Sequence, residues 1–293
     1  MDFHNAFELI ELCKSSNKSI SDIMRERETV ETETPLEIIE SKIKDSLDIM
    51  RISAHKPLET INKSVGGLIG GEASKLNEHY KSGKTICGNV LTKVLMYSQA
   101  VPEVNASMGV IVAAPTAGSS GVVPAILFAL EEEFGLDEKT LIDGLFTAGA
   151  VGCILMKNAS VSGAEAGCQA EIGSASAMAA AAAVIMMGGN TEQAFDAASI
   201  ALSNLLGLAC DPLAGLVEVP CQSRNAVGAA NALTSAEMAL SGIKAVIPFD
   251  EMAEAMLKIG RRMPRDLKET ALGGCAATPT GCSYKCSIFG GCK

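Results

Sequence analysis

The chain has 293 residues, a formal net charge of −10 and no tryptophan, with aromatic residues making up 4% of the total. This acidic balance argues against a nucleic acid or an anionic membrane as partner, because both are bound through basic patches. Hydrophobic residues make up 48% of the chain, so a sizeable core can form, built mainly from small aliphatic side chains.

The N-terminus, Met1-Asp2-Phe3-His4-Asn5, lacks the basic segment and apolar stretch of a secretory signal. We therefore expect a cytoplasmic protein whose ten cysteines are reduced. In that compartment, clustered cysteines more often bind metal or do chemistry than form disulfides. The longest apolar run, 175–187, is shorter than the roughly 18 residues of a membrane-spanning helix and is predicted to be a buried helix.

Three regions follow one another along the chain. Residues 1–63 are rich in charge and carry apolar residues at helical spacing, which predicts an acidic amphipathic helical region. The glycine-rich stretch 64–71 is the best internal boundary, although it could equally approach an active site. Residues 64–273 are expected to form a helical catalytic domain, followed by a cysteine-rich tail over 274–293.

Helical patterns dominate beyond residue 90, and strand patterns are nearly absent. Asn190 is the expected N-cap of a helix over 191–208, and Asp250 that of a helix over 251–262. Further helices are predicted over 122–133, over 231–240, and through Leu267 up to Gly273-Gly274. The one strand-like run, Val110-Ile111-Val112, is too short to establish a sheet, so the predicted fold class is all-α with buried Ala- and Gly-rich helices.

Three cysteines, Cys168, Cys210 and Cys221, lie beside glycine, proline or small polar residues. Each alone is more often a buried core residue. Together they favour a metal site, because the proline-flanked stretch 211–220 cannot be one helix and can place two thiolates on one side of a metal. Cys168 would join them from the start of the Ala-rich helix, where the helix dipole favours a thiolate.

Zinc and iron–sulfur ligation both use thiolates. The three cysteines lack the short CxxC spacing of structural zinc sites, and the three histidines, His4, His55 and His79, lie far upstream. Iron–sulfur ligation is therefore the better fit.

A second candidate site is the turn 115–121, which leads into the helix predicted over 122–133. Its backbone N–H groups and the hydroxyls of Thr116, Ser119 and Ser120 suit a carboxylate or phosphate. It is not a phosphate-binding Walker loop, because no Gly-Lys-Ser/Thr follows. A helix cap without a ligand is the alternative.

Two basic residues are also candidates. Lys157 is either a general base whose pKa is lowered by burial, a carboxylate anchor, or a lysine that extends to solvent. Arg224, three residues after Cys221, either clamps a substrate carboxylate or forms a structural ion pair.

Several motifs together resemble the iron–sulfur-dependent L-serine dehydratases in their α-subunit form. They are Asn105-Ala106-Ser107, Ala114-Pro115-Thr116-x-Gly118-x-x-Gly121, Gly163-Ala164-Glu165-x-Gly167-Cys168-Gln169-x-Glu171-Ile172-Gly173, Cys210-Asp211-Pro212, Val219-x-Cys221-x-x-Arg224-Asn225 and Leu272-Gly273-Gly274. The resemblance implies a lyase that converts L-serine to pyruvate and ammonia without pyridoxal phosphate, and an all-helical catalytic domain. It also implies a [4Fe-4S] cluster held by Cys168, Cys210 and Cys221, with one open iron acting as a Lewis acid on the serine hydroxyl.

Within that resemblance, Thr116, Ser119, Ser120 and Arg224 are the candidate substrate-binding residues and Lys157 is a weak candidate for the base. Single-chain members of the family carry an extra domain with a Ser-Ser-His-Thr type motif that is absent here, which implies a separate β subunit and a heterodimer. Some members end on a cysteine that plugs the open iron. Cys282 stands most nearly at that distance here, in competition with Cys275, Cys286 and Cys292, and a disordered tail is the alternative.

Three rival functions remain at this level. A related cluster-dependent lyase would act on L-cysteine and release sulfide. A non-catalytic iron–sulfur sensor or electron carrier would need a fully ligated cluster. A helical interaction protein with incidental thiols would bind no iron.

Overall fold

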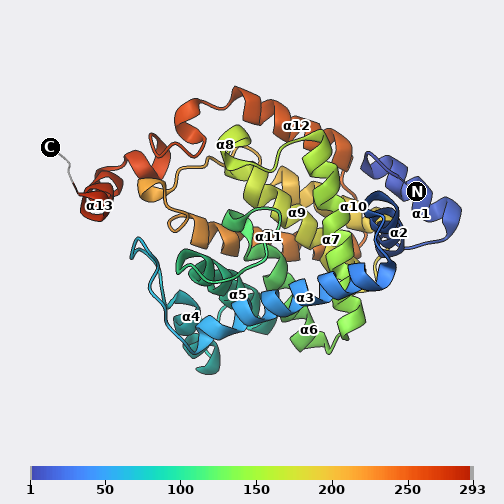
Figure 1. The fold of residues 1–293 in the computed structure, drawn as a ribbon, viewed down its shortest axis with the longest axis horizontal. Coiled ribbons are helices and arrows are strands. Elements are labelled where there is room, and N and C mark those ends of the chain that lie inside the picture. Colours follow the sequence, from blue (N-terminus) through green and yellow to red (C-terminus); the bar gives the residue numbers. More distant parts are fainter. Residues whose placement is uncertain (1, 291–293) are drawn as a thin grey trace.

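The computed structural model describes residues 2–290, and over that range it contains helices and no β-strand, which confirms the all-α prediction (Figure 1). The α-helices are α1 (Ala6–Ser16), α2 (Ile20–Thr32), α3 (Leu36–His55), α4 (Glu72–Lys81), α5 (Gly88–Ala106), α6 (Val122–Phe134), α7 (Glu138–Asn158), α8 (Gly163–Ala166), α9 (Ser174–Met186), α10 (Thr191–Ser203), α11 (Cys221–Leu240), α12 (Phe249–Arg262) and α13 (Pro279–Phe289). A π-helical turn, Gln169–Gly173, runs directly into α9.

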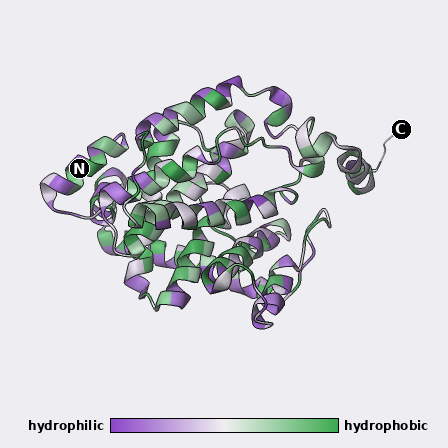
Figure 2. Ribbon diagram, turned by 180° about the vertical axis from the view of Figure 1, so that it is seen from behind, coloured by the Kyte–Doolittle hydropathy of each residue, from purple (hydrophilic) through white to green (hydrophobic). Residues whose placement is uncertain are grey.

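Helix α9 is the centre of the core and packs against α6, α7, α10 and α11. Its sequence is mostly alanine, which lets neighbouring helices approach closely. At Gly152 of α7, an added Cβ would lie 3.0 Å from the methyl group of Met178 on α9. Figure 2 shows hydrophobic residues gathered on these central helices and hydrophilic ones along the outer helices.

Within residues 2–290, two helical stretches are long and apolar enough to cross a membrane by length and composition alone. The stretch that contains α9 is 89% buried inside the fold, which confirms the prediction of a buried helix there. In the other, α7, only 56% of the apolar window is buried. Most of the other α7 residues, among them Leu145, Gly149 and Cys153, are partly buried.

Two of the predicted helix boundaries are wrong. Helix α10 begins at its predicted cap, where Asn190 Oδ1 accepts from Gln193 N at 2.9 Å, but it ends at Ser203 instead of residue 208. Beyond Ser203 the backbone hydrogen bonds to Gln169 instead of continuing the helix. Gly207 N donates to Gln169 Oε1 at 2.8 Å, and Gln169 N donates to Leu208 O at 3.0 Å. The predicted helix through Leu267 is only a 3₁₀ turn, Arg265–Leu267.

Asp250 caps a different helix from the one predicted. Helix α12 begins at Phe249, and the Asp250 carboxylate accepts from Ala6 N at 2.8 Å and from Phe7 N at 3.1 Å. It therefore stabilises the start of α1, more than 240 residues earlier in the chain.

The N-terminal helices pack on the central bundle through arginine side chains. The guanidinium carbons of Arg25 and Arg51 lie 4.5 and 4.7 Å from the ring centroids of Phe146 and Phe128. Residues of α1, α2 and α3 also belong to the same buried hydrophobic cluster as α9.

A partly exposed polar network joins α3, α5 and α6 around Glu132. Its carboxylate accepts from Tyr97 Oη at 2.6 Å and lies 3.1 Å from His55 Nε2 and 3.2 Å from Lys93 Nζ. Burial alone would raise the pKa of Glu132, but hydrogen bonds from His55, Tyr97 and Lys93 outweigh it and hold that pKa at about 2.

We expect Glu132→Gln to lower the free energy of unfolding by about 1 kcal/mol at pH 7, because charge-assisted hydrogen bonds that solvent partly screens are lost. A depressed carboxyl pKa stabilises the folded state above the unfolded value and loses that effect as the pH falls towards about 2. The difference between wild type and Glu132→Gln should therefore shrink as the pH falls below 4, measured by denaturant unfolding. Glu254→Gln, which breaks an exposed pair with Lys258, is the control and should have almost no effect. A pH-independent difference would contradict this account.

Candidate metal centre

The three cysteines singled out from the sequence are all buried and come from three separate elements. Cys168 precedes the π-helical turn, Cys210 lies in the segment after α10, and Cys221 is the first residue of α11. The structure brings them into one electrostatic environment, because charges on Cys168 and Cys221 both act on the Cys210 thiol. A π-helical turn of this kind is often found at functional sites.

Burial raises the pKa of Cys168 to about 12, against the opposing charge of Arg224. Burial, followed by the charges of Cys168 and Glu171, raises the pKa of Cys221 to about 12. Burial, followed by the charges of Glu171 and Cys168, raises the pKa of Cys210. Three thiols in this setting ionise together only if positive charge is placed among them, and a bound metal supplies such charge. The thiol set therefore fits a thiophilic metal group.

Among residues 2–290, no three His, Cys, Asp or Glu side chains are placed to share one metal ion. The thiolates that hold an iron–sulfur cluster would each bind a different iron and need not share one metal ion.

Arg224 holds the Cys210 segment in place. Its Nη1 lies 2.7 Å from Asp211 Oδ1 and donates to Ala209 O at 2.8 Å, and the guanidinium lies beside the Cys168 thiol, where its charge counters the rise in the pKa of that thiol. Of the two roles considered from the sequence, the structure shows the ion pair. A direct contact of Arg224 with a substrate stays a prediction.

The opposite side of Asp211 holds the start of the tail. Asp211 Oδ2 accepts from Cys275 N at 2.6 Å. Gly274 has a φ of +56°, and an added Cβ there would lie 2.1 Å from the same oxygen. Glycine at position 274 of the Leu-Gly-Gly motif is thus explained by close approach of its backbone to Asp211, whereas an added Cβ at Gly273 would lie 2.6 Å from Asp266 O.

Glu171, which was not selected from the sequence, links Thr116 to the thiol of Cys210. The Thr116 hydroxyl donates to Glu171 Oε1 at 2.8 Å, and Cys210 Sγ is 3.7 Å from Glu171 Oε2. Burial raises the pKa of Glu171. Its signal in the sequence was an acidic residue three positions after Cys168, just before the Ala-rich helix.

Glycine makes room for this carboxyl group. An added Cβ at Gly163 would lie 2.6 Å from Glu171 Oε2 and 3.0 Å from Cys210 Sγ, and one at Gly118 would lie 3.1 Å from Glu171 Oε1. Both glycines belong to motifs noted in the sequence.

Ser119 and Ser120 are fully buried and turn towards the backbone. Ser119 Oγ lies 3.1 Å from Thr116 Oγ1 and donates to Ala114 O at 3.2 Å, whereas Ser120 Oγ donates to Ala117 O at 2.8 Å. Thr116 and Ser119 form a capping box around the 3₁₀ turn, Ala117–Ser119. The two serine hydroxyls therefore shape the cradle, and their contact with a ligand stays a prediction.

Asn225 is a second residue that the sequence analysis did not select for the site. Its Oδ1 accepts from Gly121 N at 2.9 Å, and its Nδ2 donates to Gly118 O at 2.8 Å and to Cys221 O at 2.9 Å. The side chain is fully buried. It ties the Thr116 turn to the helix that begins at Cys221.

Lys157 lies against the N-terminal segment. Its Nζ is 2.7 Å from His4 Nδ1 and 3.9 Å from Asp2 Oδ1. In the part of the chain that the structure describes, no hydrogen bond or ion pair links it to the thiols or to Thr116.

The tail forms helix α13, at the opposite end of the molecule from α1. Cys282 is exposed, and its thiol faces Ala276 O at 3.8 Å instead of the three buried thiols. Cys275 is closer to the site because its N–H is held by Asp211. Cys286 lies within α13, and Cys292 is outside the described residues.

The sequence also matches known proteins. The model of the serine dehydratase alpha chain family covers residues 15–276. A probable L-serine dehydratase alpha chain of Bacillus subtilis (strain 168) is 50% identical over 289 residues, which are 99% of this chain and 96% of the relative. The L-serine dehydratase alpha chain of Peptoniphilus asaccharolyticus is 46% identical over 278 residues, 95% of each chain. An L-serine dehydratase of Helicobacter pylori (strain J99 / ATCC 700824) is 38% identical over 94% of this chain but only 62% of its own length.

We expect Gly274→Ala to destabilise the protein by at least about 2 kcal/mol more than Gly135→Ala does, because the new methyl group meets Asp211. Gly135 is the matched control: it has a similar positive φ of +66°, but an added Cβ there meets no atom within 4 Å. The measurement is thermal unfolding of both variants. Equal losses of stability would show that backbone conformation alone, and not contact with Asp211, requires glycine at 274.

Proposed function

The chain belongs to the serine dehydratase alpha chain family, and we propose that it is the α subunit of an L-serine dehydratase, a lyase that forms pyruvate and ammonia from L-serine. Two relatives of that name match along nearly the whole of both chains. The observation in the structure that carries the proposal is the gathering of three buried thiols beside Thr116 and Glu171.

In this proposal Cys168, Cys210 and Cys221 hold a [4Fe-4S] cluster, and pyridoxal phosphate takes no part. The soft thiolate donors, their raised pKa values and their separate elements all support this choice. When bound, a cluster with one iron free of protein ligands supplies a Lewis acid for the hydroxide that leaves serine.

The residues of the Thr116 turn position the substrate. The N–H groups at the start of α6 bind the serine carboxylate, and the Thr116 oxygen accepts a hydrogen bond from the serine ammonium group. Glu171 accepts a hydrogen bond from the Thr116 hydroxyl and thereby fixes the orientation of that hydroxyl. Ser119 and Ser120 hold the shape of the turn, and Asn225 keeps it against Cys221. Arg224 holds the Asp211 segment in position and places positive charge near the substrate carboxylate.

The base that removes the α-proton is assigned to another chain. Lys157 holds the N-terminal segment, and His4 and His55 bond to Lys157 and Glu132. The chain aligns with 62% of the Helicobacter pylori relative, which therefore has additional length beyond the aligned part. We infer that a separate β subunit supplies that part and completes a cytoplasmic heterodimer.

The tail, residues 274–293, is proposed to reach the open iron when substrate is absent. Asp211 anchors the start of the tail beside Cys210. Cys282, exposed at the beginning of α13, is the thiol proposed as the plug. Residues 64–273 are proposed as the catalytic region and residues 1–63 as the amphipathic helical region that packs on it.

Anaerobically purified protein is expected to carry about four iron atoms and four acid-labile sulfides per chain. The variants Cys168→Ser, Cys210→Ser and Cys221→Ser should each lose most of the iron. Cys87→Ser, at a partly exposed cysteine before α5, is the control and should retain it. Iron content that is insensitive to the three replacements would exclude them as ligands.

Serine-dependent pyruvate formation should require the β subunit, with little activity from this chain alone. The same assay with L-cysteine distinguishes the dehydratase from a cluster-dependent desulfidase, which would release sulfide. A redox-active cluster without turnover of either amino acid would favour the sensor or electron carrier instead.

Thr116→Val in the α/β complex should raise the KM for L-serine about tenfold through loss of one hydrogen bond, with iron content unchanged. Thr234→Val is the control, because the Thr234 hydroxyl bonds only to carbonyls of its own helix on the exposed face of α11. An unchanged KM in Thr116→Val would remove this hydroxyl from the substrate site.

A further inference from the structure

The segment between α5 and the Thr116 turn has an open backbone edge. Gly109 N donates to Val104 O at 2.8 Å, and Ala114 N donates to Thr116 O at 3.4 Å. Between these two bonds, the backbone N–H and C=O groups of residues 110–113 make no hydrogen bond to any part of the described chain. Four consecutive residues therefore present unused donors and acceptors.

The composition of this edge is that of a strand. Val110, Ile111 and Val112 are β-branched, and such residues favour extended backbone. The side chain of Val110 is 72% exposed, and Met108 just before it is 82% exposed. An exposed, apolar and unpaired edge of this kind is a template for pairing with another strand.

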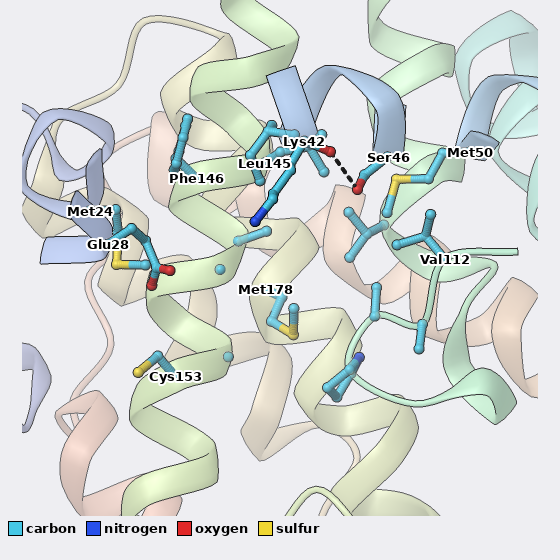
Figure 3. A pocket seen from close by; sticks show the side chains of 18 of the residues that line it. Met24, Glu28, Lys42, Ser46, Met50, Val112, Leu145, Phe146, Cys153 and Met178 are labelled. Atoms are coloured by element: carbon cyan, nitrogen blue, oxygen red, sulfur yellow. Dashed lines mark hydrogen bonds between the residues drawn. The ribbon is translucent and has the colours of Figure 1, made fainter. Parts of the chain in front are cut away.

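A groove runs beside the same segment. It has a volume of about 520 Å³ and is bounded by α2, α3, α7 and residues 112–115. Figure 3 shows Met24 and Val112 on opposite sides, with Leu145, Cys153 and Met178 between them. Leu145, Gly149 and Cys153 of α7 form part of its wall, and an added Cβ at Gly149 would meet no atom within 4 Å.

We propose that a segment of the β subunit adds as a strand to residues 110–113 and that its alternate side chains enter this groove. Backbone hydrogen bonds would supply affinity, and the groove would supply selectivity for apolar side chains. The inference rests on the proposed function, because it names the place where the missing part of the enzyme binds.

The position of the edge argues for this occupant. Ala113 precedes Thr116 by three residues, which is at most roughly 10 Å of extended chain. A strand paired at 110–113 therefore brings the rest of its chain next to Thr116 and Glu171, where the base is missing. The Helicobacter pylori relative, with one longer polypeptide and 38% identity, shows that additional chain accompanies this fold.

Amide hydrogen exchange of the cluster-loaded chain, with and without purified β subunit, tests the contact directly. In the isolated chain the amides of residues 110–113 should exchange rapidly, because they lack partners. In the complex, alternate amides of the four should exchange at least about tenfold more slowly, because a paired strand directs every second N–H to its partner. Unchanged exchange in a complex that has formed overturns the proposal.

Proline substitution tests the same alternation. Successive N–H groups of a strand point in opposite directions, so only one of Val110 and Ile111 directs its N–H towards the partner. Proline lacks an N–H, and Val110→Pro and Ile111→Pro therefore remove one N–H that faces the partner and one that faces away. We expect one of them to weaken β-subunit binding at least about tenfold more than the other, measured by titration in sedimentation or interferometry. Equal effects of the two would argue against strand pairing.

Because a proline variant can lose binding by misfolding, a side-chain variant provides a second test. Val110→Asp should weaken binding of the β subunit while leaving helix content and iron content unchanged. Val246→Asp is the matched control, because Val246 is 97% exposed in the connection between α11 and α12. Equal binding by Val110→Asp and the control would overturn the proposal.

Failure of the docking surface and failure of the proposed function give different results. A complex that dehydrates serine without protection of residues 110–113 overturns only the docking surface. A complex that protects these amides but turns over no serine leaves the docking surface supported and removes the dehydratase activity. Absence of any complex overturns the docking surface as well.

Discussion

The site depends on the buried pair between Arg224 and Asp211. Arg224 connects the first turn of α11 to the Cys210 segment, and Asp211 in turn holds the N–H of Cys275. Removing one partner of a buried pair leaves an uncompensated charge, which costs far more than an exposed pair contributes. One ion pair therefore fixes Cys210, the helix of Cys221 and the start of the tail relative to one another.

Small residues make this arrangement sterically possible. The alanines of α9 allow its neighbours to pack closely, and the glycines at 118 and 163 leave space for the carboxyl group of Glu171. Small residues also affect the surface. Gly149 and its neighbours on α7 line a groove beside residues 112–115. A core of small side chains thus accompanies both a close-packed site and a groove next to it.

Some elements were predictable because their causes are local. The Asn190 cap was predicted correctly, since its partner Gln193 is three residues away. The length of α10 and the role of Asp250 were not, because Gln169 and the N-terminus of α1 are distant in sequence. Glu171 and Asn225 were overlooked as individual residues for the same reason: their partners lie on other elements.

The sequence by itself determined the helical fold class, the three cysteines as a possible ligand set and the Thr116 turn, because periodicity, cap residues and residue chemistry are properties of short stretches of chain. Only the tertiary structure decided what surrounds them. It paired Arg224 with Asp211, directed Lys157 to the N-terminal segment, and left residues 110–113 with an open edge. These outcomes depend on which distant groups meet, and a burial or a charge pair is settled only when the whole chain has packed.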